Sequence, residues 1–139
     1  MIEFIYNTEW QVPHEEYYTH WLNRIIESEH HMLGELTYQF ETDERVLEVN
    51  REYLQHDYYT DIITFDYVQG NMVFGNVFVS VDRVVDNAKE LGGVMEEEMR
   101  RVMAHGVLHL VGYKDKTPNE SQVMREKENE YLKMFHVEQ

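Results

Sequence analysis

The chain has 139 residues, of which 42% are hydrophobic and 13% aromatic. This length and composition exclude a disordered chain and predict one globular domain, residues 1–139, with a sizeable core. The formal net charge of −15 disfavours a protein that binds nucleic acid through a broadly basic surface.

The cysteine count and the distribution of apolar residues limit the possible metal ligands and the cellular location of the protein. The chain has no cysteine, so any metal must be bound by histidines and carboxylates. No stretch approaches the ~20 apolar residues of a membrane span, and the N-terminus lacks the basic and then apolar layout of a signal peptide. We therefore expect a cytoplasmic protein with no membrane partner.

The negative charge is concentrated in the first part of the chain. Residues 1–82 carry 3 Lys and Arg against 16 Asp and Glu, whereas residues 83–139 carry 9 against 11. Two interpretations stay open for the second part, namely a local basic patch and solvated helix faces of mixed charge. The basic residues in question are Arg100, Arg101, Lys114, Lys116, Arg125 and Lys127.

Strands and helices alternate along the first 54 residues. Residues 2–7 are rich in β-forming side chains and predict a strand. Pro13 marks the start of an amphipathic helix, and Gly34 predicts the turn into a half-buried strand over 35–42. The sequence Thr-Asp-Glu at Thr42 then predicts the start of a second helix.

The second part of the chain predicts two strands and three helices. Strands over 62–67 and 72–81 are separated by a short turn, so they should pair antiparallel. Ser80 or Asp82 caps the next helix, and helices over 95–110 and 119–135 follow. The whole pattern predicts an α+β fold, or a mixed α/β sheet, in which about five helices flank a four-stranded mixed sheet.

Two histidines near the end of the predicted helix 95–110 suggest a metal site. His105 and His109 are four residues apart, so both side chains lie on one helix face and can bind one divalent ion. Gly112 offers a helix stop, after which Asp115 can return as a third ligand. Two histidines and one carboxylate, with the fourth position left to water, are typical of catalytic zinc. Because the chain has 8 histidines, a buried pair with other partners is the alternative.

The residue after the first histidine limits the chemistry. Zinc peptidases of the His-Glu-x-x-His type carry their general base there, whereas this chain has Gly106. The base must therefore lie elsewhere, or the metal alone must lower the pKa of water. A glycine here also leaves room for another element or a substrate backbone to approach the helix.

Three stretches together resemble the YbeY family of metal-dependent endoribonucleases, which are rRNA maturation factors. The stretch from His105 to Tyr113 is similar to the family's His-Gly-x-Leu-His-Leu-x-Gly-Tyr motif. Asn50-x-x-Tyr53, followed by residues 57–65, resembles a second family block, and residues 75–80 resemble a third. In the family, the loop over 56–61 leads into the active-site strand, so its polar groups are candidates for lining the cleft.

Two positions depart from the family pattern. The family's third metal ligand is a histidine, and here Asp115 would take its place, with an oxygen that zinc accepts. The family has an arginine linked to RNA handling at the position of Leu54. His56 could replace this arginine, and the simpler interpretation is that His56 is a solvated loop histidine.

The resemblance implies a single-strand-specific endoribonuclease with one zinc ion per chain, bound by His105, His109 and Asp115. It also implies a role in 16S rRNA 3′-end maturation and ribosome quality control. The expected partners are ribosomal RNA and the ribosome or its associated proteins, and not DNA. Two alternatives stay open: a metallohydrolase of another substrate class, and a ribosome-assembly factor with a structural metal. The sequence does not identify a catalytic base.

Overall fold

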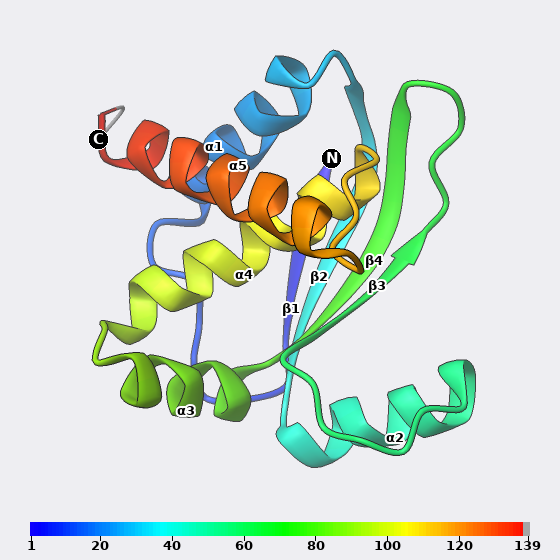
Figure 1. Cartoon of the computed structure of the whole chain (residues 1–139), viewed down its shortest axis with the longest axis vertical. Helices are drawn as coiled ribbons and strands as arrows, with labels where there is room; N and C mark the ends of the chain where they lie inside the picture. The colour runs from blue at the N-terminus through cyan, green and yellow to red at the C-terminus, as the bar shows by residue number, and fades with distance from the viewer. Residues whose placement is uncertain (138–139) are drawn as a thin grey trace.

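The computed structural model describes residues 1–137, in which five helices surround one four-stranded sheet (Figure 1). The last two residues of the predicted domain lie outside this range. The elements are β1 (Ile2–Tyr6), α1 (Glu15–Ser28), β2 (Met32–Glu41), α2 (Asp43–Leu54), β3 (Ile62–Asp66), β4 (Met72–Ser80), α3 (Val81–Leu91), α4 (Met95–Leu110) and α5 (Pro118–Val137).

The sheet is mixed and has the strand order β1-β2-β4-β3. Strand β2 pairs in parallel with β1 and with β4, whereas β3 pairs antiparallel with β4 across a short turn. The predicted α+β class, the mixed four-stranded sheet and the antiparallel pair are thus confirmed. Parallel neighbours need a crossover connection, and the helices between these strands provide it.

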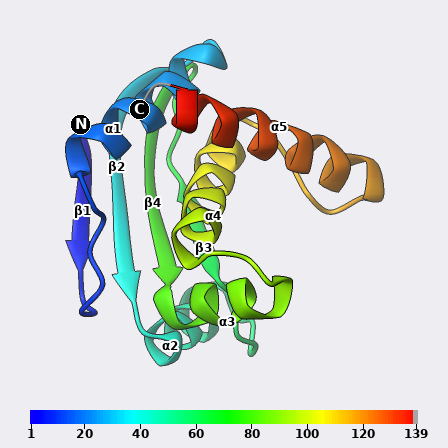
Figure 2. The same cartoon turned by 90° about the vertical axis from the view of Figure 1, so that its left-hand side faces the viewer.

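The two faces of the sheet are covered by different helices (Figures 1 and 2). Because side chains alternate along a strand, Ile62 of β3 points toward α4, while Ile63 packs with Val46 and Val49 of α2. Helices α1 and α4 contact the sheet on the side of the main core. The main core therefore lies between the sheet and α4.

Glycines let α4 lie very close to the sheet. A Cβ atom on Gly106 would lie 3.1 Å from Ile62 Cδ1 and 3.3 Å from a Val77 methyl carbon. On the sheet, a Cβ on Gly75 would lie 2.8 Å from a methyl carbon of Leu110, the last residue of α4. Glycine is required at such positions because any side chain would push the two layers apart.

Several sequence-based boundaries were wrong by one or more residues, among them the following three. Gly34 lies inside β2, at a register irregularity between Leu33 and Glu35, and not in a turn. Helix α1 begins at Glu15 rather than at Pro13. Val81 belongs to α3 and not to β4, because the Ser80 hydroxyl accepts a hydrogen bond from the Arg83 N–H and so caps the helix.

The remaining helix signals were correct. Thr42 caps α2 by accepting from the Arg45 N–H, and Gly92 ends α3 with φ of 69°. Among residues 1–137, no helix combines the length and apolar character needed to cross a membrane.

The irregularity at Gly34 gives a stability prediction. A Cβ there would lie 2.8 Å from the Phe74 ring and 2.9 Å from the Val73 carbonyl oxygen, and a strand backbone cannot move aside cheaply. We expect Gly34→Ala to lower the free energy of unfolding by about 1–3 kcal/mol. Gly93→Ala, with nothing within 4 Å of the added carbon, should change it by less than about 0.5 kcal/mol in urea denaturation. Equal stability of the two variants would contradict this account.

Candidate metal centre

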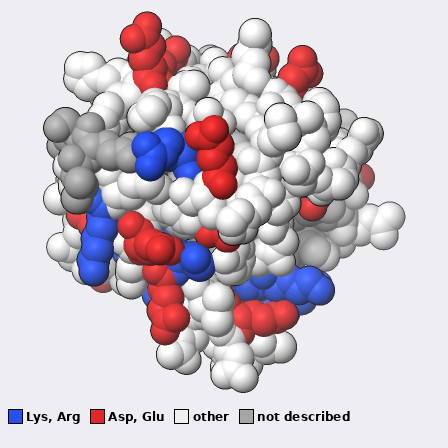
Figure 3. Space-filling model, turned by 90° about the horizontal axis from the view of Figure 1, so that it is seen from above, with Lys and Arg blue, Asp and Glu red and all other residues white. Residues whose placement is uncertain are grey.

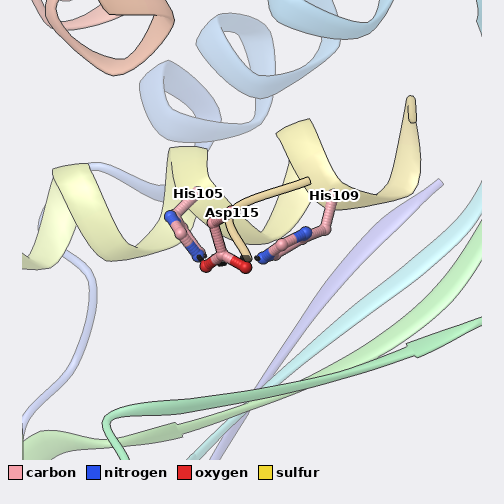
Figure 4. A group of neighbouring side chains, drawn as sticks. All are labelled: His105, His109 and Asp115. Atoms are coloured by element: carbon pink, nitrogen blue, oxygen red, sulfur yellow. Dashed lines mark hydrogen bonds and ion pairs between the residues drawn. The ribbon is translucent and has the colours of Figure 1, made fainter. Parts of the chain in front are cut away.

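The structure brings the three predicted ligands together (Figure 4). His105 and His109 lie one turn apart on α4, and their Nε2 atoms are 2.9 Å from each other. Asp115 Oδ2 lies 3.2 Å from His105 Nε2 and 3.4 Å from His109 Nε2. Three potential ligand atoms therefore converge on one point.

A glycine turn carries Asp115 back toward the helix. Gly112 has φ of 109°, and its N–H donates to the His109 carbonyl at 3.1 Å, while the Tyr113 N–H donates to the Leu108 carbonyl at 2.9 Å. This pair of bonds is the Schellman motif, which ends helices at a left-handed residue. The predicted helix stop is confirmed, and it turns the chain toward the imidazoles.

Both ends of this turn are fixed to other helices. The Tyr113 hydroxyl donates to Glu29 Oε1 at the end of α1, at 2.7 Å. Beyond Asp115, Thr117 and Glu120 form reciprocal bonds between side chain and backbone N–H at the start of α5. The Ser121 hydroxyl also donates to the Asp115 carbonyl at 2.9 Å. The turn is therefore held in a defined place.

The second nitrogen of each histidine has its own acceptor. His105 Nδ1 is 2.7 Å from Glu128 Oε2, and His109 Nδ1 is 2.9 Å from the Tyr113 carbonyl oxygen. Since both acceptors require a proton on Nδ1, the neutral rings present unprotonated Nε2 atoms to each other and to Asp115. A metal-binding histidine usually has such an outer partner.

These atoms fit a divalent cation. Tetrahedral zinc with bonds of roughly 2.0–2.1 Å places its ligand atoms about 3.3 Å apart, close to the separations of 2.9–3.4 Å seen here. Without a cation or a shared proton, two lone pairs would face each other beside a carboxylate. The side chains stay 21%, 29% and 39% exposed, so a fourth ligand or a substrate can reach the site, as in catalytic zinc sites.

A pocket of about 320 Å³ opens beside His105 and Asp115, between α4, α5 and the start of β3. It carries four acidic and two basic side chains. These are Asp61, Glu98, Asp115 and Glu128 with Arg101 and Arg125.

Glu128 stays ionised in this pocket. Burial acts to raise the pKa of its carboxyl, but hydrogen bonds from His105 and Arg101 outweigh burial and hold that pKa below its ordinary value. For His105, burial acts to lower the pKa, but Glu128, Asp115 and Asp61 outweigh it and raise that pKa. In the metal-free chain, a proton therefore competes with a cation for His105.

Gly106 faces the sheet and not the pocket, since Ile62 and Val77 fill the space beside it. The sequence left open whether another element or a substrate backbone approaches α4 at Gly106, and the structure shows that the neighbouring strands do so. The glycine makes room for packing, and substrate does not approach there.

The sequence missed several residues of the site. Glu128 gave no signal, because its contact with Arg101 at 3.0 Å joins residues 27 positions apart on two helices. Arg101 and Arg125 were among the residues of a possible basic patch, and both line the pocket together with four carboxylates. Of the loop over 56–61, Asp61 lines the pocket. His56 is exposed and stacks on Tyr58, which supports the reading as a solvated loop histidine.

Two histidines and a carboxylate beside an open pocket are characteristic of metal-dependent hydrolases. The model of the family described as Endoribonuclease YbeY matches residues 4–136. The chain therefore belongs to the YbeY family of endoribonucleases, as its motifs suggested.

Relatives and a solved structure agree with this assignment. The Endoribonuclease YbeY of Flavobacterium johnsoniae is 51% identical over 100% of both chains. That of Bacteroides thetaiotaomicron is 50% identical over 84% of this chain and 85% of its own. The solution structure of TM1509 from Thermotoga maritima has a TM-score of 0.72 at 25% identity and covers 99% of this chain and 91% of its own.

The partner of His105 gives a prediction on metal binding. Glu128→Gln removes the charge that orients the His105 ring, so we expect zinc affinity to fall by about 10–100-fold. Competition with a chromophoric chelator measures this affinity. Glu126→Gln, two residues away on the exposed side of α5, should bind zinc as the wild type does. Unchanged affinity in Glu128→Gln would show that this contact does not support the site.

Proposed function

We propose that this chain is a metal-dependent endoribonuclease that cleaves single-stranded RNA, with residues 1–139 acting as one domain. The observation that carries the proposal is the open convergence of His105, His109 and Asp115 in a chain that belongs to an endoribonuclease family. The partial exposure of these three side chains weighs against a metal with only a structural role.

We propose one zinc ion per chain, bound by His105, His109 and Asp115. When bound, zinc supplies Lewis-acid polarisation of a phosphate oxygen at the scissile bond. Nitrogen and carboxylate ligands suit zinc. The protein residues position the ligands, since Glu128 and the Tyr113 carbonyl fix the imidazole planes.

The pocket charge makes RNA binding dependent on the cation. With its four carboxylates ionised and the histidine neutral, the two arginines leave the pocket with a formal charge of −2. A divalent cation cancels this charge, and a phosphate can then enter without repulsion. On the face shown in Figure 3, acidic and basic side chains are interspersed, so this face presents no broad basic area to a phosphate.

The proposed substrate is ribosomal RNA, at the 3′-end of the 16S species, with a further role in ribosome quality control. The family resemblance supports this part of the proposal. The ribosome or its proteins would provide the basic surface that this chain, at −15, does not, and the site of action would be the cytoplasm.

Removing one ligand tests the proposed activity. We expect His109→Ala to lose cleavage of a single-stranded RNA by at least about 100-fold, because two ligands no longer hold the cation. The far-ultraviolet circular dichroism should stay native, since the side chain is only half-buried. His136→Ala, an exposed histidine on α5, serves as the control. Full cleavage by His109→Ala would refute the catalytic metal, whereas unfolding would favour a structural one.

A further inference from the structure

The proposed function needs a group that accepts a proton, and no residue has so far been given that role. When a phosphodiester is cleaved, an oxygen nucleophile loses its proton as it bonds to phosphorus, and the bond from phosphorus to the leaving ribose oxygen breaks. Gly106, where zinc peptidases carry their base, packs against the sheet. The side chains in this pocket that could accept the proton are its carboxylates.

Two of the four pocket carboxylates are already engaged. Asp115 belongs to the ligand set. Glu128 uses both oxygens, because Oε2 is 2.7 Å from His105 Nδ1 and Oε1 accepts from Arg101 at 3.0 Å. A carboxylate held by two cationic or protonated partners is a weak base. Asp61 and Glu98 remain.

Position separates these two carboxylates. Glu98 precedes His105 by seven residues on α4, which at ~1.5 Å per residue places its backbone roughly 10 Å back along the helix. Asp61 lies across the pocket on the sheet side, and the next residue, Ile62, packs at the level of Gly106, directly after His105. Asp61 therefore faces the pocket beside the first metal ligand.

Asp61 is also held firmly. Its Oδ2 accepts a hydrogen bond from the Asn87 side chain at 3.2 Å, and its backbone carbonyl accepts from the Ser80 N–H at 2.9 Å. The Asn87 amide is neutral, so it orients the carboxylate without neutralising its charge. Without a metal, burial raises the pKa of Asp61 above its ordinary value, although His105 opposes this effect.

We propose that Asp61 is the general base of the reaction, an inference that rests on the proposed endoribonuclease function. Its carboxylate takes the proton from the attacking hydroxyl, of water or of the RNA itself, as the new bond to phosphorus forms. The leaving ribose oxygen keeps the electron pair of the broken bond and takes up a proton, from Asp61 or from solvent. If Asp61 gives this proton, its carboxylate is restored in the same step, and if solvent gives it, Asp61 releases its own proton to solvent.

The first experiment compares Asp61→Asn with the wild type, both loaded with zinc, on a single-stranded RNA oligonucleotide. Asparagine keeps the size of the side chain and an oxygen for Asn87 but cannot take the proton. We expect kcat to fall by about 10²–10⁴-fold, with KM and zinc content unchanged. Asp57→Asn, an exposed residue of the same loop, should cleave as the wild type does.

A second variant separates a base from a side chain that only supports the fold. Asp61→Ala opens space beside the pocket, and added formate should restore part of its cleavage, while formate should not accelerate the wild type. A merely structural role for the link between Asp61 and Asn87 would show no such rescue.

The outcomes are distinguishable. If the zinc-loaded wild type does not cleave RNA, the proposed function fails and the general base fails with it. If the wild type cleaves and Asp61→Asn equals it, only the assignment of Asp61 is overturned, and a large loss in Glu98→Gln would move the role to Glu98. Loss of zinc from Asp61→Asn would also overturn the assignment.

Discussion

The close packing of α4 on the sheet is the constraint on which the site depends. Because Gly106 has no side chain, Ile62 and Val77 of the sheet lie against the backbone of α4. This contact fixes the rotation of α4 about its axis. Because His105 directly precedes Gly106, the rotation that buries the glycine turns the two imidazoles toward the pocket. The same contact brings the start of β3, with Asp61, to the opposite side of that pocket.

The third ligand depends on the turn that follows the helix. Asp115 is not on a regular element, so its position comes from the Schellman motif at Gly112 and from the bonds that tie the turn to α1 and α5. Helix α5 contributes a second time through Glu128, which orients His105. The site is thus built where α4, α5 and β3 meet, and each contributes a group with a different task.

The sequence predicted those parts of the site that depend on interactions between residues close together in the chain. The spacing of His105 and His109, the stop at Gly112 and the return of Asp115 all act over a few residues, and the structure places these three side chains together. The structural role of a glycine was harder to predict. Gly34 lies in close contact with Phe74, and a glycine required by packing looks the same in sequence as one required by a turn. Nothing local signals such a contact.

Long-range partners could not be predicted for the same reason. Glu128 and Arg101 meet because α4 and α5 pack together, and Asp61 reaches the pocket because β3 lies beside α4. The net charge of the whole chain was also a poor guide to phosphate binding. What matters for a phosphate is the balance within the pocket, which a divalent cation can bring from −2 to neutral, and not the total over the surface.

The central claim is that His105, His109 and Asp115 bind one cation. The most direct measurement is the zinc content of chelator-free wild-type protein, together with X-ray absorption at the zinc edge. The account predicts one zinc per chain, with two nitrogen ligands at about 2.0–2.1 Å and carboxylate oxygen at about 2.0–2.2 Å. The signal should be lost in Asp115→Ala and retained in Asp115→His. A wild-type protein that takes up no zinc at neutral pH would contradict the account.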